Sequence, residues 1–281
     1  MASSSAQGSA EITGSHFGSD WIVLADAGGR APPLGACAYA AKALRDTLMK
    51  GWHGPIPEVI SGHAANGPPS RECHMSIVPL TDIGLADATG RLMGLGVVLP
   101  RLTETSGIAT AIRATLTAAD KTQDDLASLR LTFGGNGVWR LQVARPESAV
   151  LQPKRYSAAS YCWESITPLV YDKFPRSPRG PEAELIIAEA CQNIGLPEPR
   201  AIEITARPRT GGVIEALGNV NEFGLKDWSL PQRQDGTPNP LNSRLRNHVR
   251  LAFSEPVSGP VILGAGRFSG LGLCLPFADQ M

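Results

Sequence analysis

Apolar residues in the first half of the chain follow strand-like and helix-like spacings in turn, and this pattern predicts a βαβ-containing unit. Short apolar runs typical of strands occupy residues 21–24, 74–80 and 92–99. Small and apolar residues at helical spacing predict helices over 34–50 and 105–118. Two more strand-like runs, 129–133 and 137–143, flank Gly134-Gly135-Asn136 and predict a hairpin that closes the unit.

The second half repeats this order of elements after a change of composition around residues 146–153. A strand-like run at 163–170 is followed by a helix over 182–193, with Gly195 just beyond its end, and by an alternating strand at 201–206. A polar segment rich in Gly, Pro and Asn follows. The last apolar runs, 249–253 and 261–263, lead into the terminal run of the chain.

Two units of similar size and element order predict an α+β protein built from tandem ferredoxin-like domains. The chain has 281 residues, which is enough for each unit to bury a core of its own. We expect an N-terminal ferredoxin-like domain over 19–150 and a C-terminal one over 151–281. Residues 1–18 are small and polar at their start and predict a disordered leader.

Charge and cysteine content narrow the classes of function. Lys plus Arg and Asp plus Glu number 26 each, so a nucleic-acid binder would have to use local basic segments, such as 173–179 and 244–250. The five cysteines are scattered and odd in number, which favours free thiols in a reducing, cytoplasmic compartment. No run of about 18 apolar residues predicts a membrane span.

The terminal run, residues 263–277, joins a glycine-rich loop directly to an apolar strand. Glycine allows positive φ angles and close approach of the main chain to a ligand, and a guanidinium among the glycines is a forked donor for phosphate. A dinucleotide-binding fingerprint is excluded by context, because that motif opens a helix. We therefore expect a cradle for a phosphate backbone formed by Gly264, Gly266, Arg267, Gly270 and Gly272.

Two blocks of sequence carry a family resemblance. The first, within residues 61–100, contains SGH, HMSIVPL and ADATGRLMGLGVVLP, and the second, residues 248–276, reads HVRLAFSEPVSGPVILGAGRFSGLGLCLP. In this order and at this separation they resemble the CRISPR-associated RAMP proteins. The resemblance is greatest to the C-terminal half of the fused Cascade subunit of type I-U (I-G) systems.

The resemblance implies a tandem ferredoxin-like endoribonuclease that matures CRISPR RNA. Such a protein would bind the repeat RNA, cleave the precursor once per repeat without metal or cofactor, and stay on the product. Its implied partners are the repeat RNA and other Cascade subunits, including a backbone-binding RAMP portion that this chain lacks. One departure is Leu85, which stands where related sequences often have a histidine before the Ala86-Asp87 dipeptide.

Metal-free cleavage of RNA needs a base, an acid and positive charge at the phosphorane, and histidine suits both proton roles. His63, in the loop after the first helix, is the first candidate, because the resemblance places proton-transfer histidines in that region. His74, at the start of the next strand, is the expected partner. The plainer alternatives are a turn-capping His63 and a strand-end core His74. His16 falls in the predicted leader, and His53 suits the helix dipole.

Basic and aromatic residues supply candidates for RNA binding. Alternation predicts one basic strand face carrying Arg244, Arg246, His248 and Arg250, unless the first two lie in a loop and are merely solvated. Phosphate contacts by these groups would give salt-dependent binding. Unpaired bases are often stacked on aromatic rings, and the candidates are Tyr156, Tyr161, Trp163, Tyr171 and Phe268. For Trp163 the core alternative is favoured, and Phe268 is either a plug or a platform.

Three other interpretations lead to different experiments. A structural subunit would bind guide RNA at one end of a surveillance complex without cutting it. A small-nucleotide enzyme would use the glycine-rich loop, although that loop carries neither a Lys-Ser/Thr pair for a triphosphate nor an acid cluster for magnesium. A zinc site at His63, Cys73 and His74, with Glu72 beside them, is not favoured, because adjacent residues on a strand point to opposite faces.

Overall fold

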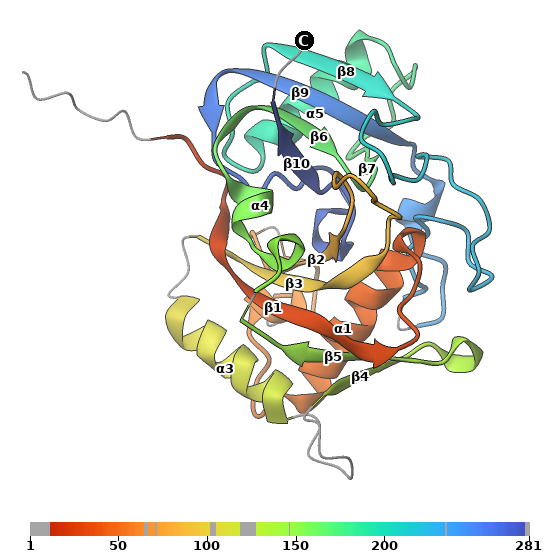
Figure 1. The fold of residues 1–281 in the computed structure, drawn as a ribbon. Coiled ribbons are helices and arrows are strands. Elements are labelled where there is room, and N and C mark those ends of the chain that lie inside the picture. Colours follow the sequence, from red (N-terminus) through yellow and green to blue (C-terminus); the bar gives the residue numbers. More distant parts are fainter. Residues whose placement is uncertain are drawn as a thin grey trace, which may run out of the picture.

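The computed structural model describes residues 12–64, 67–70, 72–101, 105–118, 128–145, 147–233 and 235–278 of the chain (Figure 1). In these residues the strands form a first sheet from β1 (Phe17–Gly29), β2 (Ser76–Thr81), β3 (Leu92–Pro100), β4 (Leu129–Thr132) and β5 (Val138–Val143). The strand order is β2-β3-β1-β5-β4, and the neighbouring strands are antiparallel. The order β2-β3-β1-β5 is that of a ferredoxin-like βαββαβ unit. β4 extends the sheet as the hairpin partner of β5.

The helices of the first unit are α1 (Cys37–Gly51), α2 (Glu58–Ser61) and α3 (Thr105–Ala118). α1 contacts α3 as well as strands at both edges of the first sheet, β2 and β4. Its buried residues recur at helical spacing and include Ala41, Leu44 and Leu48. The predicted helices and the hairpin around the η2 turn (Gly134–Asn136) are confirmed.

The second unit has the same strand order. Its sheet contains β6 (Ser160–Ser165), β7 (Leu169–Val170), β8 (Ala201–Thr205), β9 (Arg246–Val257) and β10 (Cys274–Phe277), with α5 (Pro181–Gln192) between β7 and β8. β9 lies between β6 and β8, and β10 pairs with the other edge of β6. A second helix would come between β9 and β10 in a complete ferredoxin-like unit. The glycine-rich segment, residues 258–273, takes its place with the short η5 turn (Arg267–Ser269).

Three predicted boundaries differ from the structure. The run at 163–170 is divided into β6 and β7 around Pro168, because proline lacks the N–H that would continue the ladder. Residues 261–263 make only an isolated bridge, Ile262 to Leu273, while β9 is longer than predicted. Residues 12–18 are not a disordered leader: Gly14 bridges to Ser258 and Phe17 is buried at the start of β1. Residues 1–11 lie outside the described part of the chain.

The two units share one hydrophobic cluster. The η3 turn (Ala149–Leu151) and α4 (Lys154–Ser157) connect them, and the buried Tyr156 hydroxyl accepts a hydrogen bond from Thr81 N at 3.1 Å. Figure 1 shows the glycine-rich segment between the two sheets, and η5 contacts both β2 and α1. The polar segment 207–242 also packs on the first unit, where the main-chain N–H of buried Trp228 donates to Gly35 O at 2.6 Å.

Candidate nucleic-acid interface

The glycine-rich segment is packed inside the protein instead of forming an open cradle. Gly264 and Gly272 have φ angles of +78° and +76°. A Cβ at Gly264 would lie 2.3 Å from Val170 O, and one at Gly272 would lie 1.9 Å from Leu263 O. The glycines therefore permit close approach of one main-chain segment to another, and this internal packing accounts for them without a phosphate. The predicted cradle is corrected on this point.

Replacing Gly272 by alanine is expected to lower the free energy of unfolding by at least about 2 kcal/mol. A Cβ there meets backbone atoms, which cannot swing away, and a positive φ costs about 1–2 kcal/mol for a residue with a Cβ. Chemical denaturation measures the change. Gly211→Ala is the control, because a Cβ at Gly211 meets no atom within 4 Å. Equal stability of the two variants would contradict the packing role of Gly272.

Arg267 is partly exposed, and its guanidinium already has partners within the chain. Nη1 donates to Gly264 O at 2.9 Å and lies 3.6 Å from Asp172 Oδ1. The guanidinium also lies 4.6 Å from the centroid of the Phe268 ring. The Phe268 ring also stacks on the His74 ring, with 3.5 Å between the two ring centroids. These contacts make Phe268 a plug between the units, not an open platform for a base.

The predicted basic face of β9 is closed at two of its four positions. His248 has no exposed surface, and Arg250 is 6% exposed and lies 3.5 Å from both Glu164 and Glu203. Arg246 is bound to Leu241 O at 3.1 Å, and Arg244 to Tyr171 O at 3.1 Å. The segment after β8 covers this side of β9, where Ile214 O and the Trp228 ring contact His248. Alternation places His248 and Arg250 on one face, but that face is internal at both positions.

His248 is held as a neutral ring. Its Nε2 lies 3.0 Å from Ile214 O, and its Nδ1 lies 3.0 Å from Ser165 O and 3.1 Å from Ser165 Oγ, which also accepts the N–H of Val249. Burial lowers the pKa of His248 from 6.5 to about 4.

Acid is expected to destabilise the protein through His248. A histidine whose pKa is lower in the folded than in the unfolded state makes its full contribution to the free energy of unfolding above pH 6.5. That contribution is lost as the pH falls toward 4. The loss is on the order of 2–3 kcal/mol. Urea unfolding at pH 7 and pH 4.5 measures it, and His248→Gln should show a shallower pH dependence than the wild-type protein. Parallel pH profiles would contradict the assignment.

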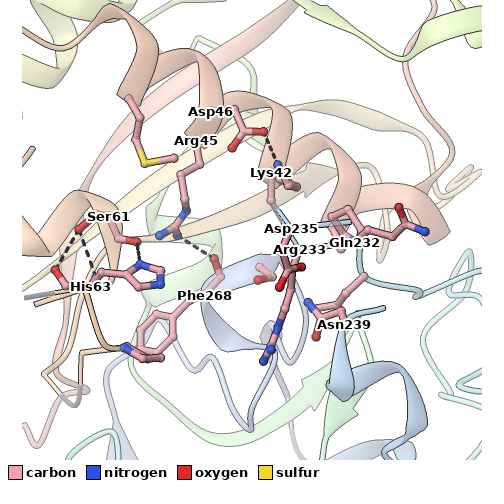
Figure 2. Close-up of a pocket in the computed structure, with 18 residues that line it drawn as sticks. Lys42, Arg45, Asp46, Ser61, His63, Gln232, Arg233, Asp235, Asn239 and Phe268 are labelled. Carbon is pink, nitrogen blue, oxygen red and sulfur yellow. Dashed lines mark hydrogen bonds and ion pairs between the residues drawn. The ribbon is translucent and has the colours of Figure 1, made fainter. Parts of the chain in front are cut away.

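A cavity of about 740 Å³ lies between α1, the loop after α2, η5 and the segment 230–239. Figure 2 shows its side chains: Lys42 and Arg45 from α1, His63 from the loop, Phe268 from η5, and Gln232, Arg233 and Asn239 from the far wall. Cations from two segments, α1 and 230–239, thus line the same cavity as the exposed His63 ring, together with Asp46 and Asp235. Lys42 pairs with Asp46 on the same helix.

His63 follows a tight turn that presents its ring to this cavity. Gly62 has φ +71° and caps α2, and a Cβ there would lie 2.8 Å from His74 Nε2. The His63 Nδ1 lies 3.1 Å from Ser61 O, and its main chain bridges to Pro69. Nε2 is therefore the ring nitrogen that is left for a ligand.

His74 lies on the other side of Phe268. It is 9% exposed, its Nδ1 lies 3.2 Å from Glu72 O, and it lines a second cavity of about 590 Å³ together with His16 and Arg267. Burial and the nearby charge of Arg45 lower its pKa to about 4, so the ring is neutral at pH 7. The structure thus brings His63 and His74 close through the Gly62 turn, but it does not place them in one cavity, and His74 is better suited to support the turn than to donate a proton.

Arg45 ties these segments together. Its guanidinium donates to Ile60 O at 3.1 Å, Met75 O at 2.9 Å and Phe268 O at 3.0 Å. Ile60 precedes the His63 turn, Met75 follows His74, and Phe268 belongs to the glycine-rich segment. Burial lowers the pKa of Arg45 to about 10, which leaves it charged at neutral pH. One side chain thus fixes the loop of His63 relative to the second unit.

Comparison with known proteins gives the family. The sequence model described as "CRISPR-associated protein, GSU0054 family" matches residues 30–276, which begin just after β1 and include the residues that line the larger cavity. The chain belongs to this CRISPR-associated family. No curated protein matches the chain. Its helices, as far as the structure describes them, include none long and apolar enough to cross a membrane.

Sequence reasoning missed several residues that the structure of this CRISPR-associated protein makes prominent. Arg45 stands beside Leu44 on a helix that was predicted correctly, but its three carbonyl partners are far apart in sequence. His16 was assigned to a leader, yet it lines the second cavity. Among the proposed base-stacking residues, Tyr156, Trp163 and Tyr171 are buried, and Tyr161 is exposed. No group of three or more His, Cys, Asp or Glu side chains in the described residues could hold a metal ion.

Proposed function

We propose that this CRISPR-associated protein binds the repeat RNA of a precursor transcript, cleaves it without a metal ion, and retains the product. The observation that carries the proposal is the exposed His63 ring in a cavity lined by Lys42, Arg45 and Arg233. A titratable ring beside cations is what transfer of a ribose 2′-hydroxyl proton requires. The five free cysteines suit the reducing cytoplasm in which we place this reaction.

The proposed reaction assigns His63 to proton transfer. The ribose 2′-oxygen attacks the adjacent phosphorus, its proton passes to His63 Nε2, and the bond from phosphorus to the 5′-oxygen breaks as that oxygen takes a proton from water. The products are a 2′,3′-cyclic phosphate and a 5′-hydroxyl. Lys42 and Arg233 at the cavity wall would offset charge on the phosphorane. Arg45, charged and fixed, holds the loop that carries His63.

Phosphate contacts outside the cavity are proposed for the partly exposed arginines. Arg267, Arg244 and Arg246 each retain some exposed surface although their guanidinium groups bind carbonyl oxygens of the chain. The glycines near Arg267 contribute to binding only by shaping this segment. The other Cascade subunits are the proposed protein partners that would hold the retained product.

The test is incubation of the chain with the repeat RNA of its own locus in excess chelator. The proposal expects one cut per repeat, a 2′,3′-cyclic phosphate end and a complex that survives the cut, and it expects His63→Ala to bind the RNA without cutting it. Binding by the wild-type protein with no cleavage would overturn the enzymatic proposal. It would favour a structural RNA-binding subunit of a Cascade-type complex instead.

A further inference from the structure

Phe174 is an exposed aromatic residue in the loop between β7 and α5. Its side chain is 62% exposed, while Tyr171 and Pro175 on either side of it are buried. A single exposed apolar residue needs no explanation on a mobile loop or a helix face. Here the flanking residues pack inward and the ring points out, so the local fold presents it to solvent.

The loop that carries Phe174 is held at both ends. The Tyr171 hydroxyl donates to Pro178 O at 3.2 Å, and the Asn247 amide donates to the same carbonyl at 3.0 Å and to the hydroxyl at 3.2 Å. Arg176 N donates to Glu182 Oε2 at 2.8 Å. A ligand that stacks on this ring would therefore lose little affinity to ordering of the loop.

A fixed cation lies over the ring. The Arg244 guanidinium is 5.4 Å from the centroid of Phe174 and is anchored to the carbonyl oxygens of Tyr171 and Asp172. The loop also carries exposed Lys173, Arg176 and Arg179, of which Lys173 pairs with Glu189. An aromatic ring beside an arginine in basic surroundings is the combination that stacks unpaired bases of single-stranded nucleic acids.

The residues just before β9 link the loop of Phe174 to the larger cavity. Asn242 exchanges two hydrogen bonds with the main chain of Leu230, a residue of the cavity wall, and also accepts one from Arg246. Arg244, two residues further along, reaches the loop of Phe174. A strand of RNA that leaves the cavity along this wall would meet the exposed ring.

We propose that Phe174 and Arg244 form a stacking platform for an unpaired base of the bound RNA. The proposal rests on the proposed function only in taking RNA as the ligand, since the platform contributes to binding and not to cleavage. A stacked base supplies about 1–3 kcal/mol, which corresponds to about 5- to 150-fold in affinity. Unlike a phosphate contact, it leaves the salt dependence of binding unchanged.

The test measures the affinity of the repeat RNA at two salt concentrations in the His63→Ala background, where binding is read without cleavage. Phe174→Ala should weaken binding at least about fivefold at both salt concentrations, and Phe174→Trp should restore it. Leu185→Ala is the matched control, because Leu185 on α5 is also 62% exposed but is aliphatic and has no ring on which a base could stack. Thermal unfolding of each variant checks the fold.

The outcomes separate this proposal from the proposed function. Affinity of Phe174→Ala within twofold of its parent overturns the platform and leaves cleavage by His63 untouched. A wild-type protein that binds RNA in a Phe174-dependent way but never cuts it overturns the enzyme and leaves the platform. A wild-type protein that does not bind repeat RNA overturns both.

Discussion

Substitution of His63 by alanine is expected to slow cleavage of the repeat RNA by about 10²–10⁴-fold, with RNA affinity within about threefold of wild type. Cleavage should depend on the ring, because it is the exposed imidazole in the larger cavity and its Nε2 makes no hydrogen bond with the described residues. Affinity should change little, because the cations at the cavity come from Lys42, Arg45 and Arg233. Single-turnover cleavage and filter binding measure the two quantities separately.

The matched control for this variant is His53→Ala. His53 is an exposed histidine of the same unit, lying in the connection between α1 and α2, and it lines neither of the two cavities. The His53→Ala variant should cleave the repeat RNA at the wild-type rate. If both variants cleave normally, or if His63→Ala loses binding in parallel with cleavage, His63 is not the proton-transfer group. Cleavage that survives His63→Ala but not His16→Ala would move the reaction to the second cavity.

The fold was predictable because it depends on local periodicity. Apolar runs bounded by Gly and Pro gave β2, β3 and β8 to within a few residues, and helical spacing gave α1 and α5. Repetition of that order along the chain gave the two ferredoxin-like units. The replacement of the second helix of the C-terminal unit by the glycine-rich segment with η5 was not among the predictions.

The site was less predictable because its contacts join segments far apart in sequence. Glycines suited to a phosphate cradle proved equally suited to close packing against Val170 and Leu263, and the sequence does not distinguish the two uses. Alternation placed His248 and Arg250 on one face, but only the tertiary fold shows that the segment after β8 covers His248 and that Glu164 and Glu203 lie beside Arg250. Phe174 escaped notice because neither its exposure nor the cation over it has a local signal.

Replacement of Arg45 is expected to lower both the free energy of unfolding and the rate of cleavage. Arg45→Met keeps the aliphatic volume but leaves the carbonyl oxygens of Ile60, Met75 and Phe268 without their donor. Each orphaned buried acceptor costs about 1–3 kcal/mol, and since such costs are not additive we expect a loss of about 3–5 kcal/mol in the free energy of unfolding. Urea denaturation measures it, and cleavage should fall because the His63 loop loses its anchor.

Lys42→Met is the matched control for Arg45→Met. Lys42 lies one turn away on α1 and lines the same cavity, but its partner is the exposed Asp46 on the same helix, so its loss should cost less than about 1 kcal/mol. Arg45→Lys keeps the charge but cannot reach three carbonyls with one fork, and it should fall between the two. If Arg45→Met were no less stable than Lys42→Met, the three carbonyl contacts would not hold the loop and the glycine-rich segment together. Loss of cleavage in Arg45→Met alone would then point to a direct role of its charge at the phosphorane.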